Sequence, residues 1–168
     1  MVVKPYRIIN KLARRYPLRN EEKMLLGTDG SITNLLEILF NDEVVVETIS
    51  QRIVECVNYR SVILKIRDIP LVYATSKIPL KNIQDKTLRD SIRRDLLSAD
   101  IPIGKILKMH NLETRREIVD ITCREVEESV RRYLNTERRI LPQRTYNIIY
   151  RGKTLMEIRE IFNVGEHL

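Results

Sequence analysis

The sequence predicts a single domain of the α+β class, built around a largely antiparallel sheet. Two pairs of apolar, β-branched runs, within residues 60–77 and 144–162, are each joined by a short turn in the manner of a β-hairpin. Helix-like segments precede the first hairpin and separate it from the second, without the strand–helix alternation of a doubly wound sheet. The 168 residues can bury one substantial core, and no internal repeat divides them.

The first 20 residues are predicted to be a basic N-terminal arm, and residues 21–168 to be the folded domain. The arm contains the one local stretch of the sequence in which every charged residue is basic, KPYRIINKLARRY. We expect a short helix around Ile8–Arg15. We favour a solvated arm, because its charges prefer water. The alternative is an arm that binds nucleic acid, since its aromatic residues could stack on bases.

Residues 21–27 are predicted to form a turn of helix that ends at Gly27 as the C′ residue. Asp29-Gly30 then makes a tight turn. Ser31 is expected to cap the next helix, over residues 32–42, because its hydroxyl can accept a hydrogen bond from a first-turn amide. Apolar residues fall on one face of this helix, which must therefore pack: Ile32, Leu35, Leu36 and Leu39.

The β-branched run 44–53 has strand character. The hairpin that follows has strands Arg60–Ile66 and Leu71–Lys77, joined by a turn at Arg67–Pro70 and closed by Pro79.

Between the hairpins, residues 80–98 carry an apolar stripe at helical spacing, and Pro102 is expected to open a short helix as its N1 residue. Residues 113–126 alternate between polar and apolar, as in a strand with one solvated face, and 125–135 are helix-like. A second hairpin, with its turn at residues 151–153, ends the fold.

Several classes of site are absent from the sequence, because no GxGxxG, GxxxxGK[ST], HExxH, CxxC or GxSxG motif occurs. Cys56 and Cys123 are 67 residues apart, and neither His110 nor His167 has a Cys or His neighbour at ligand spacing. We therefore expect no metal site, and two buried thiols in a reducing compartment.

The charge and hydropathy patterns point to a cytoplasmic protein with an anionic partner. No apolar stretch approaches the roughly 20 residues that span a bilayer, and the sequence after Val3 is too polar for a secretory signal. An excess of 30 Lys and Arg over 23 Asp and Glu gives a net charge of +7. Such a field attracts nucleic acid or small anions, and most of the positive charge is interleaved with acids.

Two charged residues in apolar strands are candidates for a binding site. Arg60 shares a strand face with Val62 and Leu64, so its guanidinium needs either a protein carboxylate or a ligand carboxylate. Glu160, near Ile158, is either paired with a cation or a proton donor in a partly apolar pocket. An Arg60–Glu160 pair across the sheet stays open. Glycine turns before two predicted helices, at residues 27–31 and 102–104, are candidate anion cradles.

Five segments in this order resemble the chorismate pyruvate-lyase family, in its archaeal and mycobacterial branch. They are GTDGSITNLLE, RSVILKIRDIPLVYATSKIPL, DIPIGKIL, LETRREI and GKTLMEIREIF, between about Leu25 and Phe162. The resemblance implies an antiparallel sheet with helical flaps that enclose an aromatic ligand. The same fold also serves as the ligand-sensing domain of some transcription regulators.

The resemblance implies elimination of pyruvate from chorismate to give 4-hydroxybenzoate, without a metal or organic cofactor. Arg60 matches the family's carboxylate-binding arginine, because it stands ten residues before Pro70. The backbone amides of Ile32 and Ile103 match two further carboxylate contacts.

Glu160 matches the glutamate that meets the ring hydroxyl, with Glu157 as the substitute. Thr114 and Arg115 match a pair that lines the pocket, and Arg115 or another basic residue would hold the enolpyruvyl carboxylate.

Two other functions remain open at the level of the sequence. The first is a non-catalytic sensor of an aromatic acid, although residues 1–24 are too short for a winged helix that would bind DNA. The second is a protein that binds nucleic acid through the basic arm, in a strongly salt-dependent way.

Overall fold

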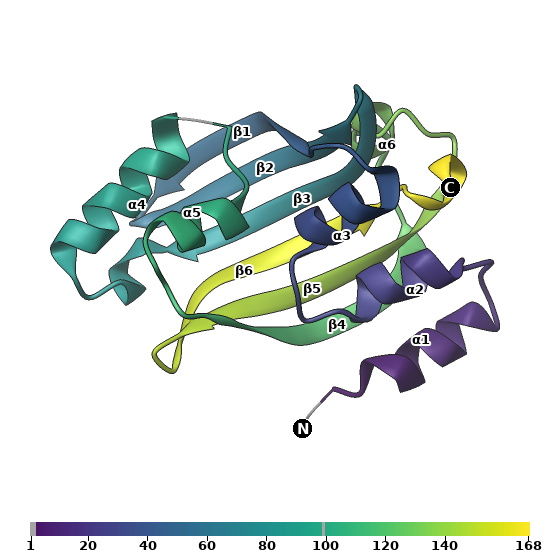
Figure 1. The fold of residues 1–168 in the computed structure, drawn as a ribbon, viewed down its shortest axis with the longest axis horizontal. Coiled ribbons are helices and arrows are strands. Elements are labelled where there is room, and N and C mark those ends of the chain that lie inside the picture. Colours follow the sequence, from purple (N-terminus) through teal and green to yellow (C-terminus); the bar gives the residue numbers. More distant parts are fainter. Residues whose placement is uncertain (1–2, 99) are drawn as a thin grey trace.

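The computed structural model describes residues 3–98 and 100–168. Its centre is a six-stranded antiparallel sheet in the order β1-β2-β3-β6-β5-β4 (Figure 1). The strands are β1 (Val45–Val54), β2 (Val57–Ile66), β3 (Ile69–Pro79), β4 (Arg115–Glu125), β5 (Ile140–Tyr150) and β6 (Lys153–Phe162). The helices are α1 (Pro5–Ala13), α2 (Asn20–Gly27), α3 (Ile32–Phe40), α4 (Lys86–Ser98), α5 (Ile103–Met109) and α6 (Glu128–Tyr133), with short 3-10 turns η1 (Leu80–Asn82) and η2 (Gly165–His167). The α+β prediction is confirmed.

The sheet consists of two three-stranded halves, β1-β2-β3 and β6-β5-β4. The halves meet where β3 pairs with β6, from Val72 opposite Phe162 to Lys77 opposite Glu157. The middle of the sheet therefore brings together residues that are 80 or more positions apart in the sequence.

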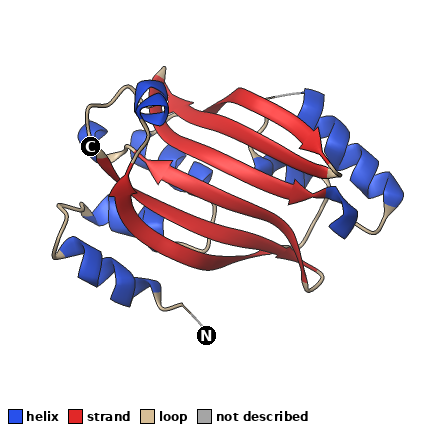
Figure 2. Ribbon diagram, turned by 180° about the vertical axis from the view of Figure 1, so that it is seen from behind, coloured by secondary structure: helices blue, strands red, loops and turns tan. Residues whose placement is uncertain are grey.

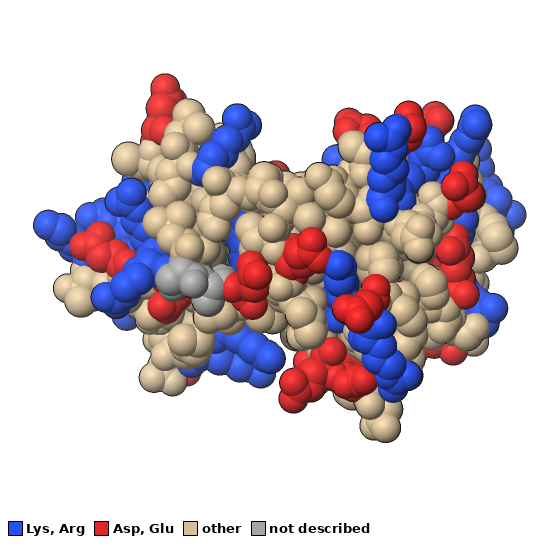
Figure 3. Space-filling model, turned by 90° about the horizontal axis from the view of Figure 1, so that it is seen from above, with Lys and Arg blue, Asp and Glu red and all other residues tan. Residues whose placement is uncertain are grey.

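The helices cover the two faces of the sheet unequally. One face carries α2, α3 and α5, whereas the face seen from behind is largely bare apart from α6 (Figures 1 and 2). None of the helices within residues 3–98 and 100–168 combines the length and the apolar character needed to cross a membrane. Basic and acidic side chains are interleaved over the surface shown in Figure 3.

Two apolar clusters fill the space between the sheet and the helices of the covered face. One joins Leu26 and Leu36 of α2 and α3 to Val62 and Leu64 of β2 and to their neighbours. The other joins buried residues of α4 and α5 to the far ends of β3, β5 and β6. A third, small cluster lies on the opposite face under α6.

The N-terminal segment differs from a solvated arm. Residues 5–13 form α1, and Ile9 is 7% exposed, with Ile8 and Leu12 packed against the first cluster. These apolar residues recur at helical spacing, so the segment buries one face although its other face is basic. Gly27 also departs from its predicted role, since it is the last residue of α2 and not a left-handed cap. A Cβ at Gly27 would lie 3.0 Å from Cδ1 of Ile9, so the glycine lets α1 approach α2.

The first hairpin forms as predicted, but its turn is tighter. The two turn residues are Arg67 and Asp68, both with positive φ (50° and 62°), as the common two-residue hairpin turn requires. Pro70 lies inside β3 and not in the turn, opposite Lys65 at a register shift. A bulge of this kind tolerates a residue that has no N–H to donate.

The two cysteines have different surroundings, so the expectation of two buried thiols is wrong for Cys56. Cys123 is buried in β4, whereas Cys56 is exposed. Glu55 and Cys56 form the turn between β1 and β2, both with positive φ, and such turns protrude into solvent.

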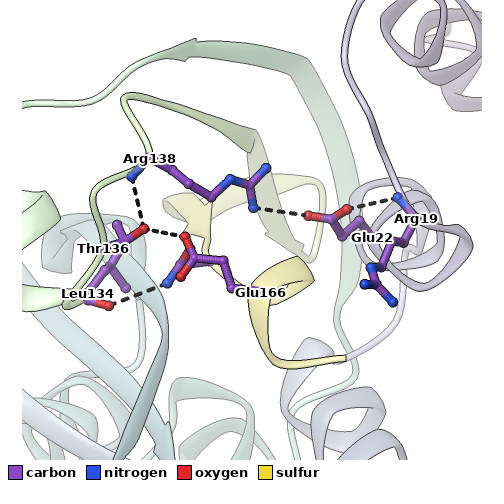
Figure 4. A network of polar contacts seen from close by, with 7 residues as sticks. Arg19, Glu22, Leu134, Thr136, Arg138 and Glu166 are labelled. Atoms are coloured by element: carbon purple, nitrogen blue, oxygen red, sulfur yellow. Dashed lines mark hydrogen bonds and ion pairs between the residues drawn. The ribbon is translucent and has the colours of Figure 1, made fainter.

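A polar network ties α2 to the segment before β5 and to η2 (Figure 4). Glu22 is 1% exposed, accepts a 2.8 Å hydrogen bond from the backbone N–H of Arg19, and lies 3.9 Å from Arg138. Thr136 donates to Glu166 over 2.6 Å and accepts from the N–H of Arg138. The network thus joins three segments that are far apart in the sequence.

The thiols should differ in reactivity. Burial raises the pKa of the Cys123 thiol to about 11, so almost no reactive thiolate forms there at about pH 8. We expect a chromogenic disulfide reagent to titrate one thiol per native chain rapidly and the second after unfolding. Cys56→Ser should abolish the rapid phase, and two equally rapid thiols in the native protein would contradict this assignment.

Gly165 should be intolerant of a side chain. A Cβ there would lie 2.6 Å from Oε1 of Glu22, whose carboxylate is buried and has little room to move. We expect Gly165→Ala to lower the free energy of unfolding in urea by about 1–3 kcal/mol. Gly104→Ala is the control, because its new methyl would meet atoms at the ordinary distance of 3.7 Å. Equal stability of the two variants would contradict the close contact.

Candidate functional site

A pocket lies on the covered face of the sheet, under the first residues of α3 and α5. It encloses about 560 Å³ of space, including the part that opens to solvent. Two three-residue segments form its roof, Ser31-Ile32-Thr33 and Pro102-Ile103-Gly104. Strand residues form its floor and walls: Val46, Arg60, Val62, Leu64, Ala74, Thr75, Ser76, Arg116, Tyr146, Ile158 and Glu160.

The floor consists of two adjacent rows of side chains that cross the sheet. The register of the strands aligns the first row as Arg60, Ser76, Ile158 and Tyr146, on β2, β3, β6 and β5. In the second row, each residue is two positions away from the residue of the first row on the same strand; this row is Val62, Ala74, Glu160 and Arg144. Because side chains alternate between the faces of a sheet, both rows point to the same side.

Arg60 is 2% exposed, and the predicted shared face with Val62 and Leu64 is confirmed, since all three line the pocket. Its Nη1 and Nη2 donate to the carbonyl of Ile101 over 3.2 and 3.1 Å, and Nη2 also lies 3.5 Å from the hydroxyl of Thr48. Its Nε is buried and has no partner within residues 3–98 and 100–168. Arg60 thus holds the loop before α5 and keeps one donor unused.

Burial lowers the pKa of the Arg60 guanidinium from its usual value, and the charge of Asp100 opposes this shift. The usual pKa of an arginine side chain is so far above neutral pH that Arg60 remains a cation after this shift. The Asp100 carboxylate accepts a 2.6 Å hydrogen bond from Thr48 and is not itself bonded to Arg60. A second anion close to Nε would therefore compensate a buried charge.

Glu160 pairs with Arg144, so the Arg60–Glu160 pair that the sequence left open is absent. Nε of Arg144 donates to Oε2 of Glu160 over 2.6 Å, and both side chains are almost fully buried. The hydroxyl of Tyr146 donates to Oε1 over 2.9 Å. Arg144 also donates to the carbonyl of Thr28 over 2.5 Å, which fixes the turn that leads into α3.

The tyrosine beside this pair remains protonated. Burial raises the pKa of Tyr146, and the neighbouring charge of Glu160 raises it further. The Arg144 guanidinium also lies 4.7 Å from the centre of the tyrosine ring. Oε2 of Glu160 accepts the hydrogen bond from Arg144, and Oε1 accepts the one from Tyr146. Each of these carboxylate oxygens has a further lone pair. Glu160 can therefore accept a hydrogen bond from a ligand hydroxyl in the pocket.

Ile32 and Ile103 are the first residues of α3 and α5, and both line the pocket. The amide of such a residue has no partner within its helix, and neither amide donates to another backbone group in the described part of the chain. Ser31 caps α3 as predicted, by accepting from the N–H of Asn34. Pro102 is the N-cap of α5 and not its N1 residue, because its ψ of 139° is extended.

The remaining predicted residues lie outside this pocket. Arg115 is exposed and pairs with Glu117 at 2.7 Å, while Thr114 lines a neighbouring groove. The arginine that lines the pocket is Arg116, since consecutive residues of β4 point to opposite faces. Glu157 lies on the bare face for the same reason.

The sequence did not predict Arg144, Tyr146 or Arg116 as parts of the site. A regular hairpin around the turn at Arg151 and Gly152 would place Glu160 opposite Gln143. A register shift at Ile148 and Ile149 places it opposite Arg144 instead. Such a shift leaves no clear signal in the residues themselves.

A family model and a related protein both describe the chain as similar to lyases. The model of the family described as chorismate pyruvate-lyase Rv2949c-like matches residues 25–167. A Methanocaldococcus jannaschii protein named "Putative lyase MJ0807" is 62% identical over 159 residues, which cover 95% of this chain and 86% of that protein.

Solved structures share the fold at low sequence identity. The ligand-binding domain of a Bordetella bronchiseptica protein assigned to the GntR family of transcriptional regulators has a TM-score of 0.55 at 14% identity, over 71% of this chain and 84% of that one. The SA0254 product of Staphylococcus aureus gives 0.57 at 10% identity, over 73% and 85% of the two chains. PhnF of Mycobacterium smegmatis gives 0.56 at 12% identity, over 80% and 64%. At these identities the likeness concerns the fold alone.

The buried pair should be measurable in the stability of the protein. Arg144→Met leaves the Glu160 carboxylate buried without its cation, which we expect to cost about 3–5 kcal/mol in urea unfolding. Replacing both residues, as Arg144→Met with Glu160→Met, should cost less than the single change.

Arg115→Met is the matched control, because its exposed ion pair contributes at most about 1 kcal/mol. If Arg144→Met and Arg115→Met unfold at the same urea concentration, the pair does not hold the sheet and the α2–α3 turn together.

Proposed function

Because the chain belongs to the chorismate pyruvate-lyase Rv2949c-like family, we propose that it eliminates pyruvate from chorismate and forms 4-hydroxybenzoate. One observation supports this proposal above all. A buried arginine with an unused donor, Arg60, and a buried glutamate with free acceptor capacity, Glu160, face the same pocket. We further propose a cytoplasmic enzyme that needs no metal or organic cofactor.

The ring carboxylate is assigned to the Arg60 end of the pocket. Nε of Arg60 is available for it, and the first amides of α3 and α5 lie in the roof at Ile32 and Ile103. A carboxylate accepts charge-assisted hydrogen bonds from such donors, and the apolar surroundings strengthen them.

The ring hydroxyl is assigned to Glu160. Its strand, β6, is two strands away from the strand of Arg60, or about 10 Å across the sheet. This separation suits a six-membered ring that carries a carboxylate and a hydroxyl at opposite ends, with a hydrogen bond at each end. Arg144 and Tyr146 fix the glutamate in place, so its position does not depend on the ligand.

The reaction changes few bonds. The ether bond between C3 and the enolpyruvyl oxygen breaks, and its electron pair leaves with that oxygen. The ring loses the proton on C4 and becomes aromatic, which drives the reaction. The enolpyruvate takes up one proton at its methylene carbon and becomes pyruvate, so protons balance and nothing is oxidised.

The residues of the pocket have mainly to orient the substrate and stabilise charge. Arg60 fixes the ring through its carboxylate. Glu160, which holds the adjacent hydroxyl, is the candidate for assisting the transfer of the C4 proton. A ligand held by both ends in a covered pocket would leave slowly, so release of 4-hydroxybenzoate is expected to limit turnover.

A second candidate function is the binding of an aromatic acid without turnover. The likeness to ligand-binding domains of GntR-family regulators favours it, because the same fold holds ligands in proteins of that kind. The two functions share the pocket and differ in whether chorismate is consumed.

Purified protein incubated with chorismate should release 4-hydroxybenzoate and pyruvate in equal amounts. Arg60→Ala should weaken the binding of 4-hydroxybenzoate, measured by calorimetry, by roughly 2–5 kcal/mol, since one partner of a buried charged contact is lost. Arg52→Ala, which removes an exposed arginine of β1, is the control and should bind as the wild type does.

Release no faster than the spontaneous background would exclude the lyase activity. Tight binding of 4-hydroxybenzoate in that case would favour the sensor. If Arg60→Ala binds 4-hydroxybenzoate as well as the wild type, the carboxylate site lies elsewhere.

A further inference from the structure

Arg116 stands where the pocket continues into a second groove. The groove runs between α3 and α5 toward the start of β4 and ends among the exposed residues Lys105, Lys108 and Glu113. Five residues border both spaces: Ser31, Thr33, Pro102, Gly104 and Arg116. Arg116 is the charged residue among them.

The guanidinium of Arg116 is partly buried, and in the described part of the chain no carboxylate forms an ion pair with it. Its Nε is buried without a hydrogen-bond partner among residues 3–98 and 100–168. Within the same residues no carboxylate pairs with it, whereas its strand neighbours Arg115 and Arg124 pair with Glu117 and Asp120. An arginine that is only partly hydrated and has no counter-ion favours a negatively charged ligand.

The side chain of Arg116 points toward the floor of the pocket. Its guanidinium carbon lies 5.8 Å from the centre of the Tyr146 ring. A Cβ at Gly104 would lie 3.7 Å from Nη2 of Arg116, so the guanidinium also reaches the roof of the pocket. Arg116 is thus held between the floor and the start of α5, beside the tyrosine that contacts Glu160.

Arg60 and Arg116 lie at opposite ends of the pocket. Their strands, β2 and β4, are separated by β3, β6 and β5, which amounts to four strand spacings or about 19 Å. Both long side chains line the space between, and Glu160 lies on the intervening strand β6. The pocket therefore has a cation at each end and a hydrogen-bond acceptor in the middle.

We propose that Arg116 binds the carboxylate of the enolpyruvyl group while Arg60 binds the carboxylate of the ring. The assignment rests on the proposed function and names the residue that recognises the part of the substrate lost in the reaction. With the ring carboxylate at Arg60 and the C4 hydroxyl at Glu160, the C3 ether next to that hydroxyl lies at the end of the ring remote from Arg60. The carboxylate of the enolpyruvyl group, which this ether carries, then extends toward β4, where Arg116 lies.

This arrangement makes Arg116 a determinant of substrate over product. Chorismate has two carboxylates, whereas 4-hydroxybenzoate keeps only the one assigned to Arg60. After the ether breaks, pyruvate would be held by Arg116 at the inner end of the groove, and the groove offers it a way out. A purely structural arginine, packed on Tyr146, would affect both ligands equally.

The test compares two probes that the enzyme does not consume, 4-hydroxybenzoate and 3-(carboxymethoxy)-4-hydroxybenzoate, which carries a second carboxylate on the C3 ether. Arg116→Met should weaken the binding of the diacid, measured by calorimetry, by at least about tenfold, as expected for the loss of a hydrogen bond between charged groups. Its binding of 4-hydroxybenzoate should stay within about twofold of the wild type.

Arg115→Met is the matched control, because it removes the adjacent but exposed arginine, and it should bind both probes normally. Arg116→Lys should recover part of the diacid affinity, since it restores a cation without the planar fork. With chorismate, kcat/KM of Arg116→Met should fall at least as far as the diacid affinity.

Each contrary result has one meaning. Equal weakening of both probes, or no weakening of either, overturns the assignment of Arg116. If the wild type turns over chorismate and Arg116→Met keeps its kcat/KM, the lyase activity stands and the Arg116 assignment fails. If the wild type consumes no chorismate but only the diacid depends on Arg116, the proposed activity fails and Arg116 remains the site of a second carboxylate. A wild type that binds neither probe overturns both proposals.

Discussion

The buried ion pair between Arg144 and Glu160 is the interaction on which the pocket depends. It joins β5 to β6 in the floor, and through the carbonyl of Thr28 it fixes the turn that leads to the first amide of α3. Arg60 makes the corresponding contact on the other side, with the carbonyl of Ile101 just before α5. Each of the two helix starts above the pocket is thus held by an arginine that rises from the sheet, so floor and roof form one unit.

These charges are poorly explained by stability alone. A buried ion pair seldom stabilises a fold more than apolar side chains of similar size would, because both ions lose their hydration. Here the charged groups lie among the residues of two apolar clusters, and Ile118 packs against both clusters. Among the described residues, the three arginines Arg60, Arg116 and Arg144 outnumber the two carboxylates whose charge acts on them, which are Glu160 and, beside Arg60, Asp100. The imbalance favours an anionic ligand, in keeping with the net charge of +7.

The sequence predicted the parts of the site that depend on local pattern. Strand alternation put Arg60 on the face of Val62 and Leu64, and the cap at Ser31 marked the start of α3. What it missed depends on register. Arg144 meets Glu160 only because of a bulge in the second hairpin, and a long-range pairing of β3 with β6 places Ala74, not Arg60, beside Glu160. In β4, Arg115 and Arg116 are both charged, so alternation offers no contrast that tells which faces inward.

The order of the strands has a consequence for how the protein is made. β6 follows β5 in the chain but lies between β3 and β5, so it is the strand that unites the two halves of the sheet. During synthesis β1, β2 and β3 can pair early, yet the inner edge of β3 stays open until residues 153–162 leave the ribosome. An open edge of apolar strand invites pairing with other chains. The nascent chain is therefore most exposed to misassembly just before its pocket can form.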